Sequence, residues 1–418
     1  MKYFNFDMNA YQLHVIKTDK FKTITVDISF RRKIKKEEIT IRNLLKEMMV
    51  NASYNYPDEK SLIIETEKLY DLKLVSSSYR VGNDSILSFR CRFLNELYTE
   101  ECMNDSSIKF LLDLVFNPLF DKELDKCKER LKKSILSLKD NKVKYALFKL
   151  LEATEDRAYS YNDYGYVEDL DNITNDSLYN YYKDVISNDL VDVFVVGDIS
   201  PDDIKNIFRE NFKVTTYHKS NFEIVVPELS SVSKIYSYNE KDRVNQTQLA
   251  ILCNINDLTD EERKYILPVY GEMLGGTSNS ILFDSVREKN SYAYYVNSIV
   301  KPYDNVMMIY SGIGKGTENE VFKLINKSLK DIRHGKFDLN KLENAKKTIS
   351  SSIMASIDNP VGIINNSYAK VLVNAKDYNE RIELISKVSR DDIIRVSKKI
   401  NIYSKFILEA NDEKNNDW

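Results

Sequence analysis

Histidine, cysteine, proline and glycine are all scarce in this sequence. Its 418 residues include three histidines, and His14, His218 and His334 lie too far apart to show the ligand spacing of a histidine-based zinc site. Seven prolines and 11 glycines argue against long disordered linkers. The four cysteines form no CxxC pair, so we expect reduced, packed thiols; they are Cys91, Cys102, Cys127 and Cys253.

Long apolar runs and blocks of one charge sign are also missing. No stretch of about 18 apolar residues is present, so the sequence predicts no membrane span. The first 18 residues hold no apolar segment of signal-peptide length, which together with the thiols predicts a cytoplasmic protein. The 61 basic and 64 acidic residues are intermixed, and no basic stripe indicates a nucleic-acid-binding surface.

The second half of the sequence repeats the pattern of the first, at an offset of about 215 residues. A predicted strand at 247–255 corresponds to one at 23–30, and a predicted helix at 260–274 corresponds to one at 37–51. A hairpin and long helices follow in both halves. We therefore predict an α+β fold of two similar domains, each a β-sheet with helices packed on one face. The predicted boundaries are 1–215 and 241–418, with a connector at 216–240.

Residues 271–296, GEMLGGTSNSILFDSVREKNSYAYYV, form the most distinctive stretch of the second half. Gly275 and Gly276 are expected to end a helix, because glycine adopts the left-handed conformation cheaply. A second amphipathic helix should then end near Arg287. Tyr294 follows in a run of residues that favour a strand. Taken alone, Arg287 would be a helix-end arginine that offsets the helix dipole, and Tyr294 would pack on a sheet.

The order Gly-Gly, Val-Arg-Glu-Lys and Ala-Tyr resembles the C-terminal domain of the pitrilysin/insulinase family of zinc peptidases. The resemblance covers nearly the whole chain, because that family also contains two similar α+β domains. It implies that Arg287 and Tyr294 contact a peptide substrate at the scissile bond. It further implies a processing-peptidase-like duplicated fold.

The same resemblance implies that the zinc site is degenerate. Active members carry H-x-x-E-H on the first helix of the N-terminal domain, where two histidines bind zinc and the glutamate activates water. The equivalent stretch here is N-L-L-K-E, which places Asn43, Lys46 and Glu47 at these positions. A neutral amide is a weak zinc ligand, and a charged lysine cannot accept a proton. The third ligand, a glutamate on a later helix, corresponds best to residues 131–135, which offer lysine and serine.

These expectations predict a non-catalytic subunit of a hetero-oligomeric zinc peptidase. It would bind peptide and supply Arg287 and Tyr294 to a zinc-bearing paralogous partner, with no metal in this chain. The sequence does not decide whether the chain also forms a homodimer. Two other hypotheses remain: a metalloendopeptidase with rewired ligands that include Glu47, and a stand-alone peptide-binding scaffold. A neighbouring gene that encodes an intact H-x-x-E-H would favour the first hypothesis.

One glycine-rich run could suggest phosphate binding. Residues 312–317, GIGKGT, lie between a predicted strand and a predicted helix. The run lacks the four-residue spacer of a Walker loop, so we expect a plain strand-to-helix turn.

Overall fold

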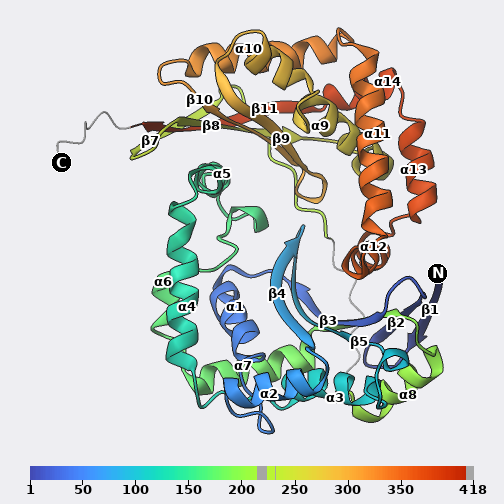
Figure 1. Cartoon of the computed structure of the whole chain (residues 1–418). Coiled ribbons are helices and arrows are strands. Elements are labelled where there is room, and N and C mark those ends of the chain that lie inside the picture. Colours follow the sequence, from blue (N-terminus) through green and yellow to red (C-terminus); the bar gives the residue numbers. More distant parts are fainter. Residues whose placement is uncertain (214–223, 231, 411–418) are drawn as a thin grey trace. The chain divides into compact units, whose positions relative to one another are not determined.

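The computed structural model describes residues 1–213, 224–230 and 232–410, which form two compact units (Figure 1). The first unit comprises Met1–Leu136, Asn162–Ile224 and Ser356–Ala369, and the second comprises Ser137–Tyr161, Val225–Ala355 and Lys370–Trp418. Each unit is a mixed sheet with helices, which confirms the predicted α+β fold. However, each unit also takes one segment from the other half of the sequence, which the predicted boundaries do not include. His218 lies outside the described residues.

The first unit contains a six-stranded sheet in the order β1-β2-β6-β3-β5-β4. Its strands are β1 (Lys2–Asp7), β2 (Gln12–Lys17), β3 (Thr23–Lys33), β4 (Lys73–Val81), β5 (Asp84–Leu94) and β6 (Leu190–Gly197). Only β2 and β6 pair in parallel within this sheet. The predicted hairpin is present between β4 and β5, and Gly82 in its turn has a φ of 54°. This positive φ favours glycine.

The helices of the first unit pack mainly on one face of this sheet. Alternation along β3 places Ile24, Val26, Ile28 and Phe30 in a core shared with these helices. The helices are α1 (Ile39–Met48), α2 (Glu59–Lys68), α3 (Asn104–Phe116), α4 (Leu124–Leu136), α6 (Val167–Leu170), α7 (Asn175–Asn188) and α8 (Pro201–Asn211). On the other face lies α12 (Pro360–Val373), whose Tyr368 ring is 5.2 Å from the ring of Phe194.

The second unit contains a five-stranded sheet in the order β7-β11-β8-β10-β9. Its strands are β7 (Tyr236–Asp242), β8 (Thr247–Ile255), β9 (Ala293–Lys301), β10 (Val306–Ile313) and β11 (Ile400–Ala410). The strand β7 pairs in parallel with β11. The predicted connector, 216–240, overlaps the start of β7, a largely exposed edge strand whose sequence, YSYNEKD, lacks the apolar alternation of a half-buried strand.

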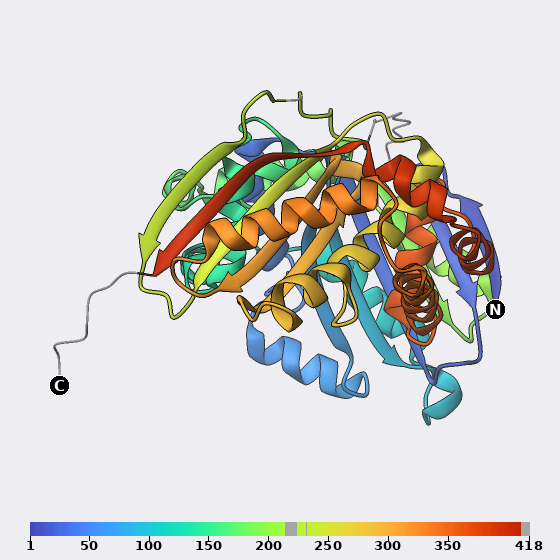
Figure 2. The ribbon, with the colours of Figure 1, turned by 90° about the horizontal axis from the view of Figure 1, so that it is seen from above.

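The second unit contains α-helices and π-helices. The α-helices are α5 (Lys142–Glu152), α9 (Leu267–Gly275), α10 (Glu318–Arg333), α11 (Leu339–Ser356), α13 (Tyr378–Ser386) and α14 (Arg390–Ser397), and the π-helices are η5 (Glu262–Ile266) and η6 (Phe283–Glu288). Figure 1 shows α5 and α10 on opposite sides of the sheet, and Figure 2 shows α10 lying over its strands. The Tyr145 hydroxyl of α5 donates to Glu240 of β7 at 2.9 Å. None of the helices among the described residues combines the length and apolarity needed to cross a membrane.

The glycines of α9 serve close packing and not a left-handed turn. The helix ends at Gly275, and Gly276 has a φ of −78°, so the expected left-handed conformation is wrong. A Cβ at Gly275 would lie 2.8 Å from the Ser298 backbone nitrogen, and one at Gly271 would lie 2.6 Å from Val300 Cγ1. The Ser298 hydroxyl donates to the Gly271 carbonyl at 2.7 Å. These glycines therefore let α9 lie directly against β9.

Candidate functional site

Arg287 lies in the last turn of η6, and Tyr294 is the second residue of β9. The exposed Arg287 guanidinium lies 4.8 Å from the ring centroid of Phe283, one turn earlier. Ala293 is buried, so the alternation of β9 directs Tyr294 to the opposite face, where it is 71% exposed. The stretch between these residues contains Ser291 at a φ of 54°.

The two residues predicted to contact substrate line one open hollow of about 490 Å³. The hairpin explains this, because Ala293 at the start of β9 pairs with Ile313 at the end of β10. The turn after β10 therefore lies beside the segment before β9, and the Gly314 amide donates to the Tyr292 carbonyl at 3.3 Å. The other residues that line the hollow are Glu288, Ser291, Tyr292, Ala293, Gly314 and Thr317.

Both side chains have hydrogen-bond donors that the protein leaves available. Within the described ranges, neither the Arg287 guanidinium nor the Tyr294 hydroxyl has a recorded hydrogen bond or ion pair. Contact with the Phe283 ring restricts the guanidinium while its N–H groups remain free to donate. The hollow thus presents two donors to a ligand that carries an oxygen acceptor.

At the position that the resemblance assigns to the first zinc-binding histidine, the Asn43 side chain bonds two segments of the chain. Asn43 is 3% exposed, and its amide donates to the Ile39 carbonyl at 3.0 Å and to the Asp163 carbonyl at 2.9 Å. Gly165 of the same loop lies so close to α1 that a Cβ there would be 2.4 Å from Thr40 Oγ1. The loop therefore covers α1 beside Asn43, whose side chain is already occupied.

Lys46 and Arg130 place positive charge at and beside the other two motif positions. The Lys46 ammonium lies 3.9 Å from the Glu47 carboxylate. Burial raises the pKa of Glu47, while the charges of Lys46 and Arg130 act to lower it. Arg130 belongs to α4, the helix on which the resemblance places the third ligand, and the Ser134 hydroxyl there donates to the Arg130 carbonyl.

These residues do not fit a zinc ion. A dication beside Lys46 and Arg130 would be repelled, and Glu47 alone supplies one ligand. In the part of the chain that the structure describes, no group of three or more His, Cys, Asp or Glu side chains is placed to hold a metal ion.

Comparison with known proteins agrees with this arrangement. Residues 172–349 match the family described as "Peptidase M16 inactive domain". "Probable inactive metalloprotease YmfF" of Bacillus subtilis (strain 168) is 25% identical over 410 residues, which are 95% of each chain. "Uncharacterized zinc protease YmxG" of the same strain is 27% identical over 304 residues, which are 70% of each chain. The crystal structure of a conserved protein from Enterococcus faecalis V583 matches with a TM-score of 0.92 and 25% identity, covering 99% of this chain and 100% of that one.

The chain is thus similar to M16 peptidases along most of its length, and residues 172–349 match the inactive domain of that family. Its substituted motif and the similarity to a relative named as inactive together support a non-catalytic, M16-like protein.

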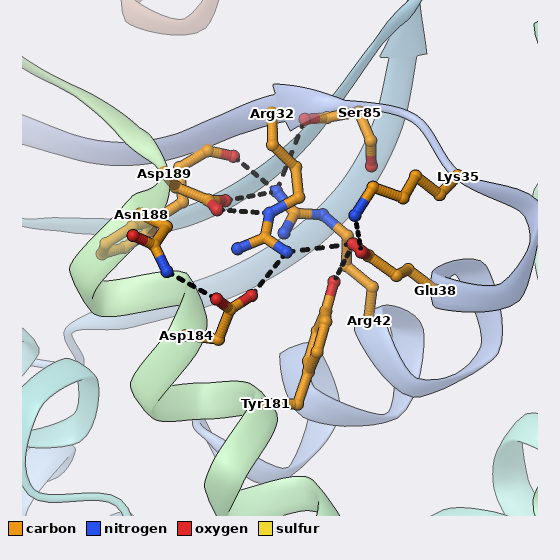
Figure 3. Close-up of polar contacts among 10 residues, drawn as sticks. Arg32, Lys35, Glu38, Arg42, Ser85, Tyr181, Asp184, Asn188 and Asp189 are labelled. Atoms are coloured by element: carbon orange, nitrogen blue, oxygen red, sulfur yellow. Dashed lines mark hydrogen bonds and ion pairs between the residues drawn. The ribbon is translucent and has the colours of Figure 1, made fainter. Parts of the chain in front are cut away.

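The sequence did not predict a buried charge network that anchors α1. Arg42 is 2% exposed, and it donates to Asp189 and to the Phe30 carbonyl, both at 2.8 Å. Figure 3 shows the guanidinium groups of Arg32 and Arg42 both reaching Asp189. Arg32 also bonds Glu38 at 3.0 Å. The helical spacing could have indicated that Arg42 is buried, because it lies three residues from both Ile39 and Leu45 on the buried face of α1.

Proposed function

We propose that this chain is the non-catalytic subunit of a hetero-oligomeric zinc peptidase. It would bind peptide and supply Arg287 and Tyr294 to the site of a zinc-bearing partner. The observation that carries the proposal is the open hollow where both donors meet, each without a recorded bonding partner in the described residues. The substituted motif on α1 explains why another chain must bring the metal.

Peptide hydrolysis places negative charge on the oxygen of the attacked carbonyl. When bound by the partner, zinc would supply the activated water and polarise that carbonyl. The guanidinium of Arg287 and the hydroxyl of Tyr294 would donate hydrogen bonds to the same oxygen as charge develops. Donors that are already oriented stabilise the transition state because they need little reorganisation. The contact with the Phe283 ring would help to hold Arg287 in this orientation.

The relatives in Bacillus subtilis support a pairing of two chains. One strain has both a relative named as a probable inactive metalloprotease and a relative named as a zinc protease, and both resemble this chain. We propose the equivalent zinc-bearing paralogue as the partner, and the cytoplasm as the location. The free thiols suit that compartment.

The test is co-expression of this chain with a paralogue that carries an intact H-x-x-E-H. Size-exclusion chromatography would measure association, and turnover of an unfolded peptide would be compared for each chain alone and for the mixture. We expect a complex whose activity exceeds the sum of the two separate activities. Peptide binding by this chain without association would favour the scaffold hypothesis. Chelator-sensitive activity of this chain alone would favour the rewired metallopeptidase.

A further inference from the structure

The helix α2 lies at the margin of the first unit (Figure 1), and all ten of its residues are described and none is buried. One face is turned inward, where Leu62 packs against the core and Leu69, just after the helix, is buried. The opposite, exposed face follows the spacing i, i+3, i+4 and i+7; its residues are Lys60, Ile63, Ile64 and Glu67. Ile63 is 51% exposed and Ile64 is 42% exposed. The outward face of α2 therefore has an apolar centre between two charges.

The stability of the helix does not explain these two charges. The helix dipole favours acidic residues in the first turn and basic residues in the last, but Lys60 lies in the first turn and Glu67 in the last. Within the described ranges neither has a recorded ion pair, and they lie too far apart to form an i, i+3 or i, i+4 pair. By contrast, Glu59 follows the dipole rule and lies 3.5 Å from Lys126. Lys60 and Glu67 thus remain available to another molecule.

The exposed face of α2 is complementary to itself. Two copies of α2 can lie antiparallel about a two-fold axis that passes midway between Ile63 and Ile64. Because positions 60 and 67 are equally far from this axis, Lys60 of each copy then lies level with Glu67 of the other. The isoleucines of the two copies meet at the centre. A two-fold axis makes each contact twice, so the pair of helices would contain two ion pairs around one apolar centre.

We propose that α2 binds α2 of a second copy of this chain, and that the protein forms a reversible homodimer through this face. Burial of Ile63 and Ile64 drives the association, and the pairing of Lys60 with Glu67 fixes the antiparallel direction. Ten-residue helices are about 15 Å long. Their pairing buries less than the roughly 1,200–2,000 Å² of a stable interface. The dimer therefore dissociates on dilution, and it does not depend on the zinc-bearing partner.

The first experiment measures the mass of the full chain alone by sedimentation equilibrium over a series of concentrations. The wild type should change from one chain to two as the concentration rises. The double variant Ile63→Glu, Ile64→Glu should stay monomeric with an unchanged unfolding midpoint, since both side chains are largely exposed in the single chain. Lys323→Glu reverses an exposed charge on α10 and should dimerise as the wild type does. A wild type that is monomeric at every concentration, or an isoleucine variant that still dimerises, would overturn the inference.

A charge exchange tests the antiparallel pairing itself. Lys60→Glu and Glu67→Lys each bring like charges level with one another at two points, so each should weaken the dimer at least about tenfold. Both changes suit the helix dipole, so a weaker dimer cannot be attributed to a weaker helix. An equimolar mixture of the two variants should dimerise again, because an acidic face then meets a basic one, and so should the double variant.

Failure of both the mixture and the double variant to recover would contradict the pairing of Lys60 with Glu67. Another occupant of this face would give a different result. If the wild-type chain stays monomeric and the isoleucine variant no longer binds the zinc-bearing paralogue, α2 contacts that paralogue and the homodimer is excluded.

Discussion

Arg42 Nη2 lies 2.8 Å from Asp189 Oδ2, and their side chains are only 2% and 0% exposed. This ion pair joins α1 to the residue between α7 and β6 in the first unit. The resemblance places the zinc ligands of active members of the family on this helix. Here the most deeply buried charge on α1 holds the helix in place.

Replacement of Asp189 should destabilise the first unit strongly. Asp189→Ala leaves the Arg42 guanidinium buried without its carboxylate, and the loss of one partner of a buried pair costs about 3–5 kcal/mol. Asp184 is the matched control, since it bonds Arg32 at 2.7 Å but its side chain is 44% exposed. Asp184→Ala should cost at most about 1 kcal/mol. Urea unfolding measures both variants, and equal midpoints would contradict this account of the network.

The contact between α9 and β9 predicts a second stability effect. A Cβ at Gly275 would lie 2.8 Å from a backbone nitrogen, which cannot move as a flexible side chain can. Gly275→Ala should therefore cost about 1–3 kcal/mol through overpacking. Gly314→Ala adds the same methyl group where there is space, and it should leave the thermal unfolding midpoint almost unchanged. Equal midpoints for the two variants would show that α9 can shift away from β9.

Glu262 should give the second unit a pH-dependent stability. Burial acts to raise the pKa of its carboxyl, but bonds from Lys399 at 2.7 Å and Arg395 at 2.9 Å prevail and lower that pKa to about 2. Because the pKa is lower in the folded state, the stabilisation is present above about pH 4.3 and disappears as pH falls towards 2. Glu262→Gln should lose up to about 3 kcal/mol at neutral pH and show a shallower loss of stability in acid. Parallel pH profiles for variant and wild type would rule out this coupling.

The chain should also bind no zinc of its own. Asn43 is occupied by backbone carbonyls, and Lys46 with Arg130 places positive charge where the cation would sit. We therefore expect elemental analysis of the purified chain to find far less than one zinc per molecule. About one zinc per chain, removed by a chelator together with peptidase activity, would support the rewired metallopeptidase.

Local patterns in the sequence predict much of this fold and of the hollow. The turn at Gly82 and the apolar stripe of α1 follow from residue spacing, and the Gly-Gly and Val-Arg-Glu-Lys motifs led to Arg287 and Tyr294. The apolar periodicity of α5 predicts a helix, but it does not indicate which of the two sheets the helix packs on, because its apolar face could pack on either one. Arg42 was missed because its partner, Asp189, is 147 residues away. Gly314 could not be assigned to the hollow from the sequence, because only the pairing of β10 with β9 brings the turn after β10 beside the start of β9.

The central claim is that Arg287 and Tyr294 serve a zinc site on another chain. The most direct measurement is kcat for peptide hydrolysis by the mixed complex with Arg287→Ala or Tyr294→Phe, with zinc content and complex formation checked for each. We expect a loss of roughly 10²–10³ in kcat for each variant, because each removes one donor to the same oxygen. The double variant should lose less than the product of the two. Lys289→Ala, which removes a nearby charge outside the hollow, should retain activity. Arg287 and Tyr294 variants that assemble normally and keep full kcat would contradict the account.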